Sequence, residues 1–316
     1  MDVLLTGASG FLGRNVIAGA PSDWRILALY NNDASFVKFA DRHERPGLTA
    51  ARCDLTDTAA VAEVFDRYGR EWDRCLYLAA KVDIPWSVRE PKNDLMLNVT
   101  PLLNILEVVR AHKLVYFSSG AVYDGSSGEV PPQTACAPTL PYAISKLTCE
   151  RYVRFFSERR RSVGDHLVVR FFGAYGPYEA PHKIYTRLLQ RFAIEGKNNY
   201  MLYGDGQNLI DAMYVDDAVD AVIRMMTGDH WNDTVNLAAG KPQTIESLAR
   251  EAAAILGVPG ATIEKQGEAH EHNQFWGSTA EMRRFYGFEP KVSLREGMTR
   301  FRKFLETSGN DRVSDS

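Results

Sequence analysis

The chain has 316 residues, of which 45% are hydrophobic and 24% are charged, with 37 basic and 40 acidic side chains. This is the composition of a globular protein with a large core, and the length suggests two domains or one large α/β unit with an appended lobe. The formal net charge of -3 offers no clustered basic excess for nucleic acid or an anionic membrane surface. No stretch approaches the roughly 18 apolar residues of a membrane span. We therefore expect neither nucleic acid nor a membrane as a partner.

The cysteines and the first residues of the chain indicate the cellular compartment in which the protein works. Cys53, Cys75, Cys136 and Cys149 form no C-x-x-C pair, which is typical of free thiols in a reducing compartment. The chain starts on an apolar strand pattern and not on the basic and apolar regions of a signal peptide. We expect a cytoplasmic protein.

Short apolar runs alternate with amphipathic stretches over the first two-thirds of the chain. The runs predict strands at residues 3–6, 25–30, 74–79, 114–118 and 166–170. The amphipathic stretches predict helices at residues 12–18, 59–68, 94–112 and 142–160. Strands separated by helices form parallel sheets with both faces covered. The predicted fold class is therefore α/β, with the doubly wound parallel sheet of Rossmann proteins.

This alternation breaks after residue 170. A turn-rich segment at 173–181 is followed by helical patterns near 185–195, at 218–226 and from Thr244. We expect a dinucleotide-binding Rossmann domain at residues 1–170, completed by a segment near 207–238 that returns to the sheet. A smaller C-terminal α/β lobe at residues 171–316 is expected to bind mainly the substrate.

A glycine-rich turn, Gly7-Ala8-Ser9-Gly10-Phe11-Leu12-Gly13, follows the first predicted strand and opens the first predicted helix. Glycines at this spacing allow a tight turn, close approach of backbone N–H groups to a pyrophosphate, and tight packing of helix on strand. The alternative is a helix cap with incidental glycines. The strand-turn-helix context favours a dinucleotide site made by Gly7, Ser9, Gly10, Phe11, Leu12 and Gly13.

The end of the second predicted strand bears on the choice between NAD and NADP. An acid there binds the ribose 2′-hydroxyl of NAD, but the strand ends in Tyr30-Asn31-Asn32, with no acid before Asp33. Asn31 or Asn32 could serve either cofactor as a neutral partner, and Arg14 could reach the 2′-phosphate of NADP. Arg14 could equally be a solvated residue of the first helical turn, so this choice stays open.

Tyr142 and Lys146 are four residues apart in the helix that Pro141 opens, so they share one face. Tyrosine keeps its proton at pH 7, because its ordinary pKa is about 10. A nearby ammonium and an oxidised nicotinamide would lower that pKa and allow general acid/base work. Ser118 and Ser119 end a predicted strand at the sheet edge where ligands bind, and a hydroxyl there could bond the substrate oxygen.

These motifs, in this order, resemble the extended short-chain dehydrogenase/reductase superfamily, of the NAD-dependent epimerase/dehydratase type. The resemblance covers nearly the whole chain. It rests on the glycine-rich turn with Thr6, Cys53-Asp54-Leu55, Leu78-Ala79-Ala80, Asn98, residues 117–123, Tyr142 with Lys146, Arg170, Tyr175-Gly176-Pro177, Gly204-Asp205-Gly206 and residues 214–217.

The resemblance implies roles for individual residues. Ser119, counted back from Tyr123, would donate to the substrate oxygen, Tyr142 would be the acid/base, and Lys146 would also hold the nicotinamide ribose. Members of the superfamily usually act on nucleotide-diphosphate sugars. Asp54 and Leu55 would contact the adenine. Leu78, Ala79 and Ala80 would contact the phosphates and the ribose.

Departures from the superfamily narrow the reaction. Its 4,6-dehydratases carry Asp-Glu directly after the Ser or Thr, where this chain has Gly120-Ala121, and its decarboxylases carry a glutamate where Ala121 stands. Water elimination needs a second proton donor that is missing here. We expect an NAD(P)-dependent sugar-nucleotide epimerase that works through a keto-sugar intermediate. The alternative is an NADPH-dependent 4-keto-sugar-nucleotide reductase, and a non-catalytic dinucleotide sensor is disfavoured because all three catalytic side chains are present.

The substrate site also departs from the pattern. Relatives usually have Asn at Gly173, Arg at Ile210 and a second Arg within residues 268–274, and a diphosphate needs such charge-assisted donors. Either cations after Pro181 replace them or the substrate is not a usual nucleotide sugar. The candidate replacements are Lys183, Arg187 and Arg191 with His182, and the expected substrate-binding residues are Lys81, Gly173, Lys183 and Arg187.

Two histidines and two helices bear on metal binding and on assembly. His270 and His272 have no cysteine or further histidine nearby and fall in a variable loop, so we expect no metal. The helices at 94–112 and 142–160 resemble the pair that forms a four-helix dimer interface in the superfamily. We expect a homodimer, although an intramolecular core would also explain the apolar side chains at residues 102–109.

Overall fold

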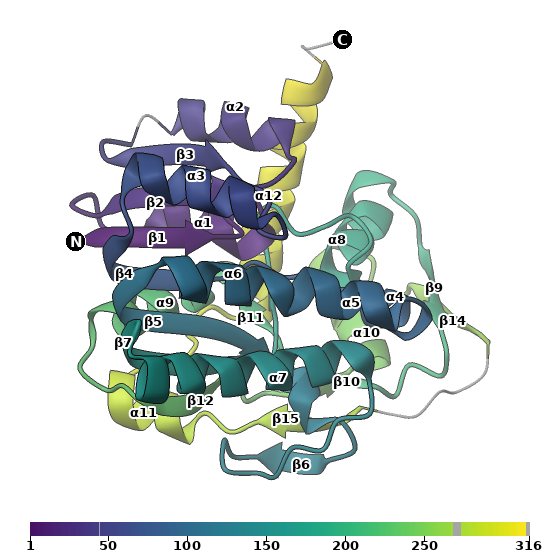
Figure 1. Cartoon of the computed structure of the whole chain (residues 1–316). Helices are drawn as coiled ribbons and strands as arrows, with labels where there is room; N and C mark the ends of the chain where they lie inside the picture. The colour runs from purple at the N-terminus through teal and green to yellow at the C-terminus, as the bar shows by residue number, and fades with distance from the viewer. Residues whose placement is uncertain (44, 268–272, 314–316) are drawn as a thin grey trace.

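A seven-stranded parallel sheet forms the centre of the computed structural model, which describes residues 1–43, 45–267 and 273–313 (Figure 1). All six strand pairs are parallel, which confirms the predicted fold class. The strands run in the order β12 (Asp233–Leu237), β7 (Val163–Phe171), β5 (Arg110–Ser119), β4 (Glu71–Tyr77), β1 (Asp2–Thr6), β2 (Arg25–Tyr30) and β3 (Leu48–Arg52).

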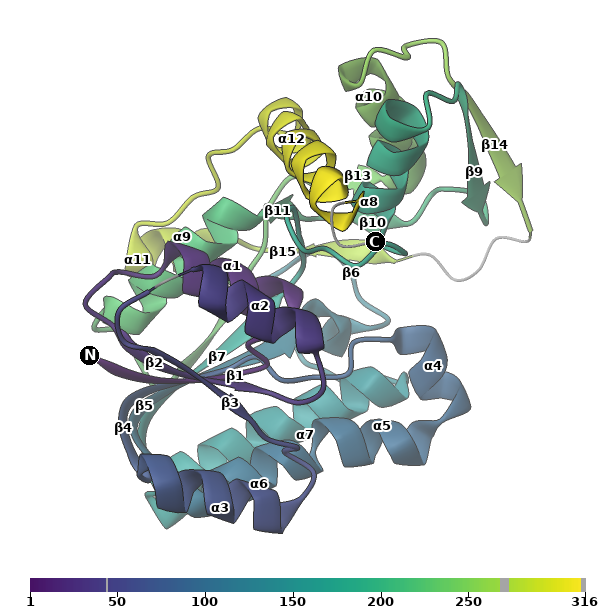
Figure 2. The same ribbon diagram turned by 90° about the horizontal axis from the view of Figure 1, so that it is seen from above.

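Helices cover both faces of this sheet (Figure 2). The central strands are therefore buried on both sides, and residues 114–118 of β5 read as a continuous buried run. One face carries α1 (Phe11–Gly19), α2 (Ala34–Arg42), α9 (Val215–Thr227) and α11 (Ala280–Tyr286). The other carries α3 (Thr58–Tyr68), α5 (Pro91–Asn98), α6 (Thr100–Val108) and α7 (Pro141–Phe155), and α4 (Ile84–Arg89) precedes α5.

The predicted helix at 94–112 is wrong in two places. Pro101 lacks the N–H that a helix interior needs, so it lies in the first turn of a new helix, α6. Residues 110–112 belong to β5, where Arg110 pairs with Glu71 of β4. The elements α2 and β3 were not predicted. Asp33 was a usable signal for the start of α2, because its side chain caps that helix by accepting from the Ser35 N–H.

An apolar cluster separate from the two that cover the faces of the sheet forms the core of a C-terminal lobe, which lies beyond the carboxyl ends of the sheet strands (Figures 1 and 2). Tyr175, Leu188, Leu248 and Phe301 belong to this cluster. Its elements are α8 (Ile184–Leu189), a π-helical turn (Gln190–Ile194), β9 (Asn199–Tyr203), α10 (Ile245–Ile255), β14 (Thr262–Gln266) and α12 (Leu294–Val313).

Short strand pairs separate from the seven-stranded sheet, and two turns, complete the described chain. The pairs are β9 with β14, β8 (Ala174–Tyr175) with β11 (Met213–Tyr214), β6 (Ser127–Val130) with β15 (Gln274–Gly277), and β10 (Leu209–Ile210) with β13 (Gln243–Thr244). A 3-10 turn spans Gly120–Tyr123 and a π-helical turn spans Phe156–Arg160.

None of the helices in the described ranges is both long enough and apolar enough to cross a membrane.

The packing at Gly13 generates a stability prediction. A Cβ there would lie 2.4 Å from the Gly7 carbonyl oxygen and 2.8 Å from the Ala8 Cα, and backbone cannot yield as a flexible side chain would. We expect Gly13→Ala to lower the free energy of unfolding in urea by about 1–3 kcal/mol, although helix propensity alone would favour alanine by about 1 kcal/mol. Gly260→Ala, where no atom lies within 4 Å of the added Cβ, is the control. A Gly13→Ala variant as stable as the wild type would contradict this packing.

Candidate active site

The glycine-rich turn is pressed against the loop that follows β4. Gly7 has a φ of 69°, and a Cβ there would lie 2.7 Å from the Ala79 nitrogen. The buried Thr6 hydroxyl accepts from the N–H groups of Leu78 and Ala79, both at 3.2 Å. The structure thus brings together two predicted cofactor-binding segments that are about 70 residues apart in the chain.

The N-terminus of α1 is open to a ligand. Gly10 is its exposed N-cap, no side chain caps the helix, and no acid lies in its first turn. Such an end has unpaired N–H groups and partial positive charge, which stabilise anions. Gly10, Phe11 and Leu12 therefore fit the pyrophosphate of a dinucleotide, with Ser9 in the turn beside them.

The ends of β2 and β3 lie side by side next to this turn, where Tyr30 pairs with Arg52 and the Ala8 N–H donates to the Leu29 carbonyl. The Asn31 side chain hydrogen-bonds Asp54, and the Asn31 carbonyl accepts from Arg52 Nε at 3.0 Å. Hydrogen bonds from Thr56 to Asp54, at 2.7 and 2.9 Å, hold the pKa of that carboxyl below its usual value. Leu55 is buried beside them, so Asn31, Asp54 and Leu55 lie together as expected for an adenosine site.

Arg14 is buried, so the expectation that it could be a solvated residue of the first helical turn is wrong. It is only 7% exposed. Its Nε donates to the Ser9 carbonyl at 2.9 Å, and its Nη2 donates to Asp33 Oδ2 at 2.7 Å and to Ser35 Oγ at 2.8 Å. The guanidinium therefore joins the glycine-rich turn to the segment after β2.

Ser119, Tyr142 and Lys146 converge at the carboxyl end of β5. Ser119 ends that strand and Pro141 opens α7, which places Tyr142 and Lys146 on the face toward the sheet. The Ser119 hydroxyl accepts from the Ala121 N–H at 3.1 Å and lies close enough to Tyr142 to lower the pKa of the phenol. Lys146 Nζ donates to the Phe117 carbonyl at 2.5 Å, and both Tyr142 and Lys146 are only 3% exposed.

The electrostatics of Tyr142 differ from expectation. Burial raises its pKa to about 12, and the nearby Ser119 hydroxyl only partly opposes this. The expected lowering by Lys146 is absent, because a lysine with a pKa of about 8 is already neutral at the pH where Tyr142 ionises. Without further positive charge in the site, Tyr142 is a neutral phenol at pH 7 and a proton donor.

Lys146 is shifted in the direction that burial dictates. Burial lowers its pKa to about 8, against the opposing effects of Cys149, Glu150 and Asp94. A lysine with this pKa is still mostly charged at pH 7 and can hold hydroxyl groups of a ligand as a donor.

A buried carboxylate beside the catalytic helix was missed by the sequence reasoning. Asp94 is fully buried, and it accepts from Ser145 Oγ at 2.7 Å and from Asn98 Nδ2 at 2.9 Å. Asn98 Oδ1 in turn accepts from the Lys81 N–H at 2.9 Å. The four-residue spacing of Asp94 and Asn98 on one helix face was a usable signal.

A second missed carboxylate, Glu150, lies one turn beyond Lys146 and is also buried. Its carboxylate accepts hydrogen bonds from Arg170 Nε at 3.0 Å, Arg170 Nη2 at 2.8 Å and Ser118 Oγ at 2.6 Å. The continued four-residue spacing from Tyr142 through Lys146 to Glu150 could have revealed it. These contacts fix α7 against β5 and β7.

The expected substrate residues are spread over several elements. Lys81 is exposed after β4, Gly173 (φ 139°) follows β7, and its carbonyl accepts from the Met213 N–H. Lys183 is the exposed N-cap residue of α8, and Arg187 is half-buried in the same helix. Ile210, where relatives carry arginine, is half-buried in β10.

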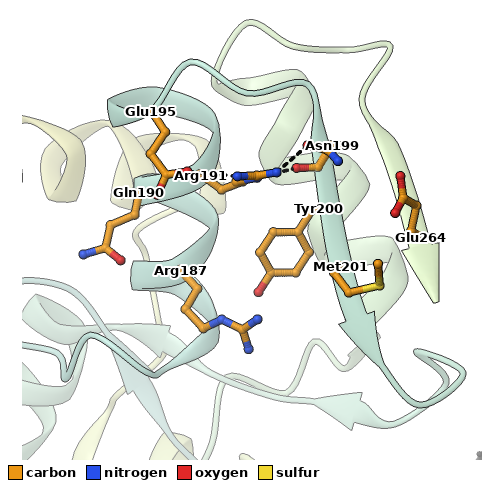
Figure 3. A pocket seen from close by; sticks show the side chains of 8 residues that line it. All are labelled: Arg187, Gln190, Arg191, Glu195, Asn199, Tyr200, Met201 and Glu264. Atoms are coloured by element: carbon orange, nitrogen blue, oxygen red, sulfur yellow. Dashed lines mark hydrogen bonds and ion pairs between the residues drawn. The ribbon is translucent and has the colours of Figure 1, made fainter. Parts of the chain in front are cut away.

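Arg187 faces a cavity of about 350 Å³ between α8 and β9 (Figure 3). Its guanidinium lies 5.4 Å from the centre of the Tyr200 ring and 5.9 Å from that of Tyr203, and the described residues give it no carboxylate partner. Arg191 is a weaker candidate, because Asn199 and Glu195 already bind its guanidinium.

His270 and His272, where the sequence predicts no metal site, lie outside the described residues. Within residues 1–43, 45–267 and 273–313, no group of three or more His, Cys, Asp and Glu side chains could hold a metal ion.

The burial of Lys146 predicts a pH dependence of stability. Between pH 8 and its ordinary pKa of 10.5, Lys146 is protonated in the unfolded chain but deprotonated in the fold. The free energy of unfolding therefore gains a term that rises with pH, by up to about 1.4 kcal/mol per pH unit. We expect Lys146→Met to remove this term in urea titrations of the protein without cofactor from pH 8 to 10. The same slope in Lys146→Met and in the exposed control Lys197→Met would contradict the shift.

Comparisons with known proteins place this site in a family. The family model described as "NAD dependent epimerase/dehydratase family" matches residues 3–238. A putative UDP-glucose 4-epimerase of Methanocaldococcus jannaschii is 23% identical over 314 residues, 97% of this chain and 99% of the relative. An uncharacterized UDP-glucose epimerase of Bacillus subtilis is 26% identical over 207 residues, 64% of each chain.

Solved structures share the fold. The UDP-glucose 4-epimerase of Thermotoga maritima, crystallised with UDP-glucose, superposes with a TM-score of 0.86 at 23% identity, covering 98% of this chain and 99% of that one. The UDP-glucuronic acid 4-epimerase of Bacillus cereus, with NAD, gives 0.84 at 20% identity, covering 98% and 100%. With the family match over most of its length, this chain belongs to the NAD-dependent epimerase/dehydratase family of extended short-chain dehydrogenase/reductase enzymes, which use NAD or NADP.

Proposed function

We propose that this enzyme is a sugar-nucleotide epimerase that inverts one sugar carbon through a keto intermediate. The convergence of Ser119, Tyr142 and the buried Lys146 at the end of β5 carries the proposal. A dehydratase is disfavoured, because Gly120 and Ala121 stand where the dehydratases are expected to carry their acid pair, and no second proton donor is present there.

In this mechanism Ser119 donates a hydrogen bond to the reacting sugar oxygen, and Tyr142 Oη exchanges the proton of that oxygen. A dinucleotide held at the glycine-rich turn and by Lys146 would supply the hydride acceptor and, in its oxidised form, positive charge. That charge opposes the burial that raises the pKa of Tyr142 to about 12. Lys146, held by the Phe117 carbonyl, keeps its charge beside the same site.

A UDP-sugar is the proposed substrate class, on the strength of the UDP-sugar epimerases among the relatives. Lys183 and Arg187 on α8 are the proposed ligands for its anionic part, with Lys81 and Gly173 nearer the sheet. Arg187 is suited to this role, because its guanidinium lies beside two tyrosine rings and forms no ion pair with a carboxylate of the described residues, although Glu195 and Glu264 line the same cavity.

The second candidate, an NADPH-dependent 4-keto-sugar-nucleotide reductase, is favoured by one observation. A neutral Tyr142 is already in the protonation state that donates to a ketone. The two functions differ in stoichiometry: a reductase consumes added NADPH, whereas an epimerase turns over with the dinucleotide it already holds.

We further propose that residues 1–170, with the returning segment 207–238, bind the dinucleotide, and that residues 171–316 mainly bind the substrate. The protein is proposed to work in the cytoplasm, which suits its four free cysteines.

Tyr142→Phe tests the acid/base role. We expect it to reduce conversion of UDP-glucose or UDP-glucuronate to the epimer, followed by NMR, by about 100- to 10,000-fold. Binding of NADH, followed by fluorescence, should persist, since the phenol is not the main anchor of the cofactor. Tyr152→Phe, an exposed position on the same helix, is the matched control. Turnover of Tyr142→Phe within tenfold of the wild-type rate would contradict the acid/base role of Tyr142.

A homodimer through α5 and α7 is the proposed assembly. These two helices pack side by side and expose large apolar side chains, namely Leu95, Met96, Leu97, Ile144, Tyr152 and Phe155. We expect the wild type to sediment as a dimer and Leu95→Glu or Phe155→Glu to sediment as a monomer. Val37→Glu, at an equally exposed apolar position on α2, should stay dimeric. A monomeric wild type at micromolar concentration would refute the proposal.

A further inference from the structure

A segment of three residues, 177–179, contacts both the glycine-rich turn side of the molecule and the helices of the lobe. We propose that this segment couples the dinucleotide site to the substrate site, and that Tyr178 is the positioning residue that holds the lobe against the turn. Binding of a dinucleotide then tightens binding of the substrate, and the reverse. The inference rests on the proposed function, in which α8 holds the anionic part of the substrate, and it applies equally to an epimerase and a reductase.

A side-chain amide ties the segment to the first turn of α1. Asn15 Nδ2 donates to the Pro177 carbonyl at 2.9 Å and to the Phe11 carbonyl at 2.8 Å. Phe11 belongs to the glycine-rich turn that fits the pyrophosphate. One side chain therefore contacts both the proposed pyrophosphate site and the segment.

The ring of Tyr178 provides a second link to the same turn. Its centre lies 5.4 Å from the Cζ of Arg14, a distance at which a guanidinium is attracted to a ring face. The same guanidinium donates to the Ser9 carbonyl at 2.9 Å. The Tyr178 ring also meets Phe39 of α2 edge-on at 5.4 Å and Phe304 of α12 at 4.9 Å. Tyr178 thus joins a helix of the lobe to two helices of the dinucleotide half.

Glu179 extends the link to α8. Its carboxylate accepts from the Thr186 N–H at 2.9 Å and from the Thr186 hydroxyl at 2.7 Å, and these bonds fix the first turn of the helix. Lys183 is the N-cap residue of this helix, and Arg187 directly follows Thr186. The position of both proposed substrate cations therefore depends on Glu179.

The backbone at Tyr178 responds to loss of these contacts. Tyr178 has a φ of 68°, in the left-handed region, which is rare for a bulky residue and costs about 1–3 kcal/mol. Such a conformation persists only while its surroundings hold it, here the side chains of Arg14, Phe39 and Phe304. When these contacts loosen, a return to negative φ moves the next residue, Glu179, relative to α8. The segment thus has two states that both sites can bias, which is what coupling between sites requires.

The test measures how much UDP, a probe for the nucleotide part of the substrate, tightens the binding of NADH or NADPH, whichever binds more tightly. Fluorescence titrations with and without saturating UDP use protein freed of any copurified dinucleotide. We expect UDP to tighten dinucleotide binding by the wild type at least about fivefold, the lower end of usual coupling energies. Tyr178→Gly removes the ring and relieves the positive φ, and should reduce this factor to below about twofold. Tyr178→Phe keeps the ring and should keep the factor.

Two further variants make the test specific to this segment. Arg161→Gly is the matched control, because Arg161 also has a positive φ, 56°, but precedes the amino end of β7, whereas both sites lie at the carboxyl ends of the strands. It should leave the factor unchanged. Phe304→Ala leaves residue 178 in place and removes one of its ring contacts. It should lower the factor as Tyr178→Gly does, and it decides the test by the same criterion if Tyr178→Gly does not fold.

The outcomes separate this inference from the proposed function. A factor near one in a wild type that binds both ligands, or a wild-type factor in Tyr178→Gly, would overturn the role of the segment and leave the family's chemistry intact. The same loss in Tyr178→Phe or in Arg161→Gly would show that ring packing at residue 178 is not its cause, and would also overturn the inference. Failure of UDP to bind the wild type would remove the proposed substrate class and the inference together.

Discussion

The burial of one ammonium group constrains the rest of this site. Lys146 is 3% exposed, and a buried cation is costly unless its donors are satisfied and opposite charge is near. The fold meets this need with the carbonyl of Phe117 at the end of β5, and with the charges of Asp94 and Glu150 on either side along α5 and α7. The charge of Lys146 beside Tyr142 therefore depends on the end of β5, which supplies the Phe117 carbonyl, and on the packing of α5 and α7, which supply Asp94 and Glu150.

The two buried carboxylates also couple the site to its surroundings. Asp94 joins α5 to Ser145 on α7 and, through Asn98, to the backbone of Lys81. Glu150 joins α7 to Arg170 on β7, and Arg170 Nη1 reaches the Tyr123 hydroxyl, which bonds Asn236 on β12. Breaking a buried pair of this kind typically costs about 3–5 kcal/mol. These contacts fix α7 against its face of the sheet, beside the carboxyl ends of β5 and β7.

The sequence predicted those features that depend on local pattern. The alternation of apolar runs and helices was enough for the sheet, and the spacing of Gly7, Gly10 and Gly13 was enough for the turn. What it could not supply depended on burial and on partners distant in the chain. Arg14 and Asp33 are 19 residues apart, and nothing in their spacing shows that each satisfies the other. The raised pKa of Tyr142 follows from how deeply α7 packs, and the helix at 94–112 failed because β5 recruits residues 110–112 by pairing with β4.

We propose that hydride leaves the sugar and returns to the same molecule within one site, while Tyr142 carries the proton. The most direct measurement follows a deuterium label at the carbon that is inverted, in a UDP-sugar incubated with the purified enzyme and no added dinucleotide. The account predicts an epimer that retains the deuterium at that carbon. An epimer with hydrogen from solvent at that position, or a product that forms only with stoichiometric consumption of added NADPH, would contradict it.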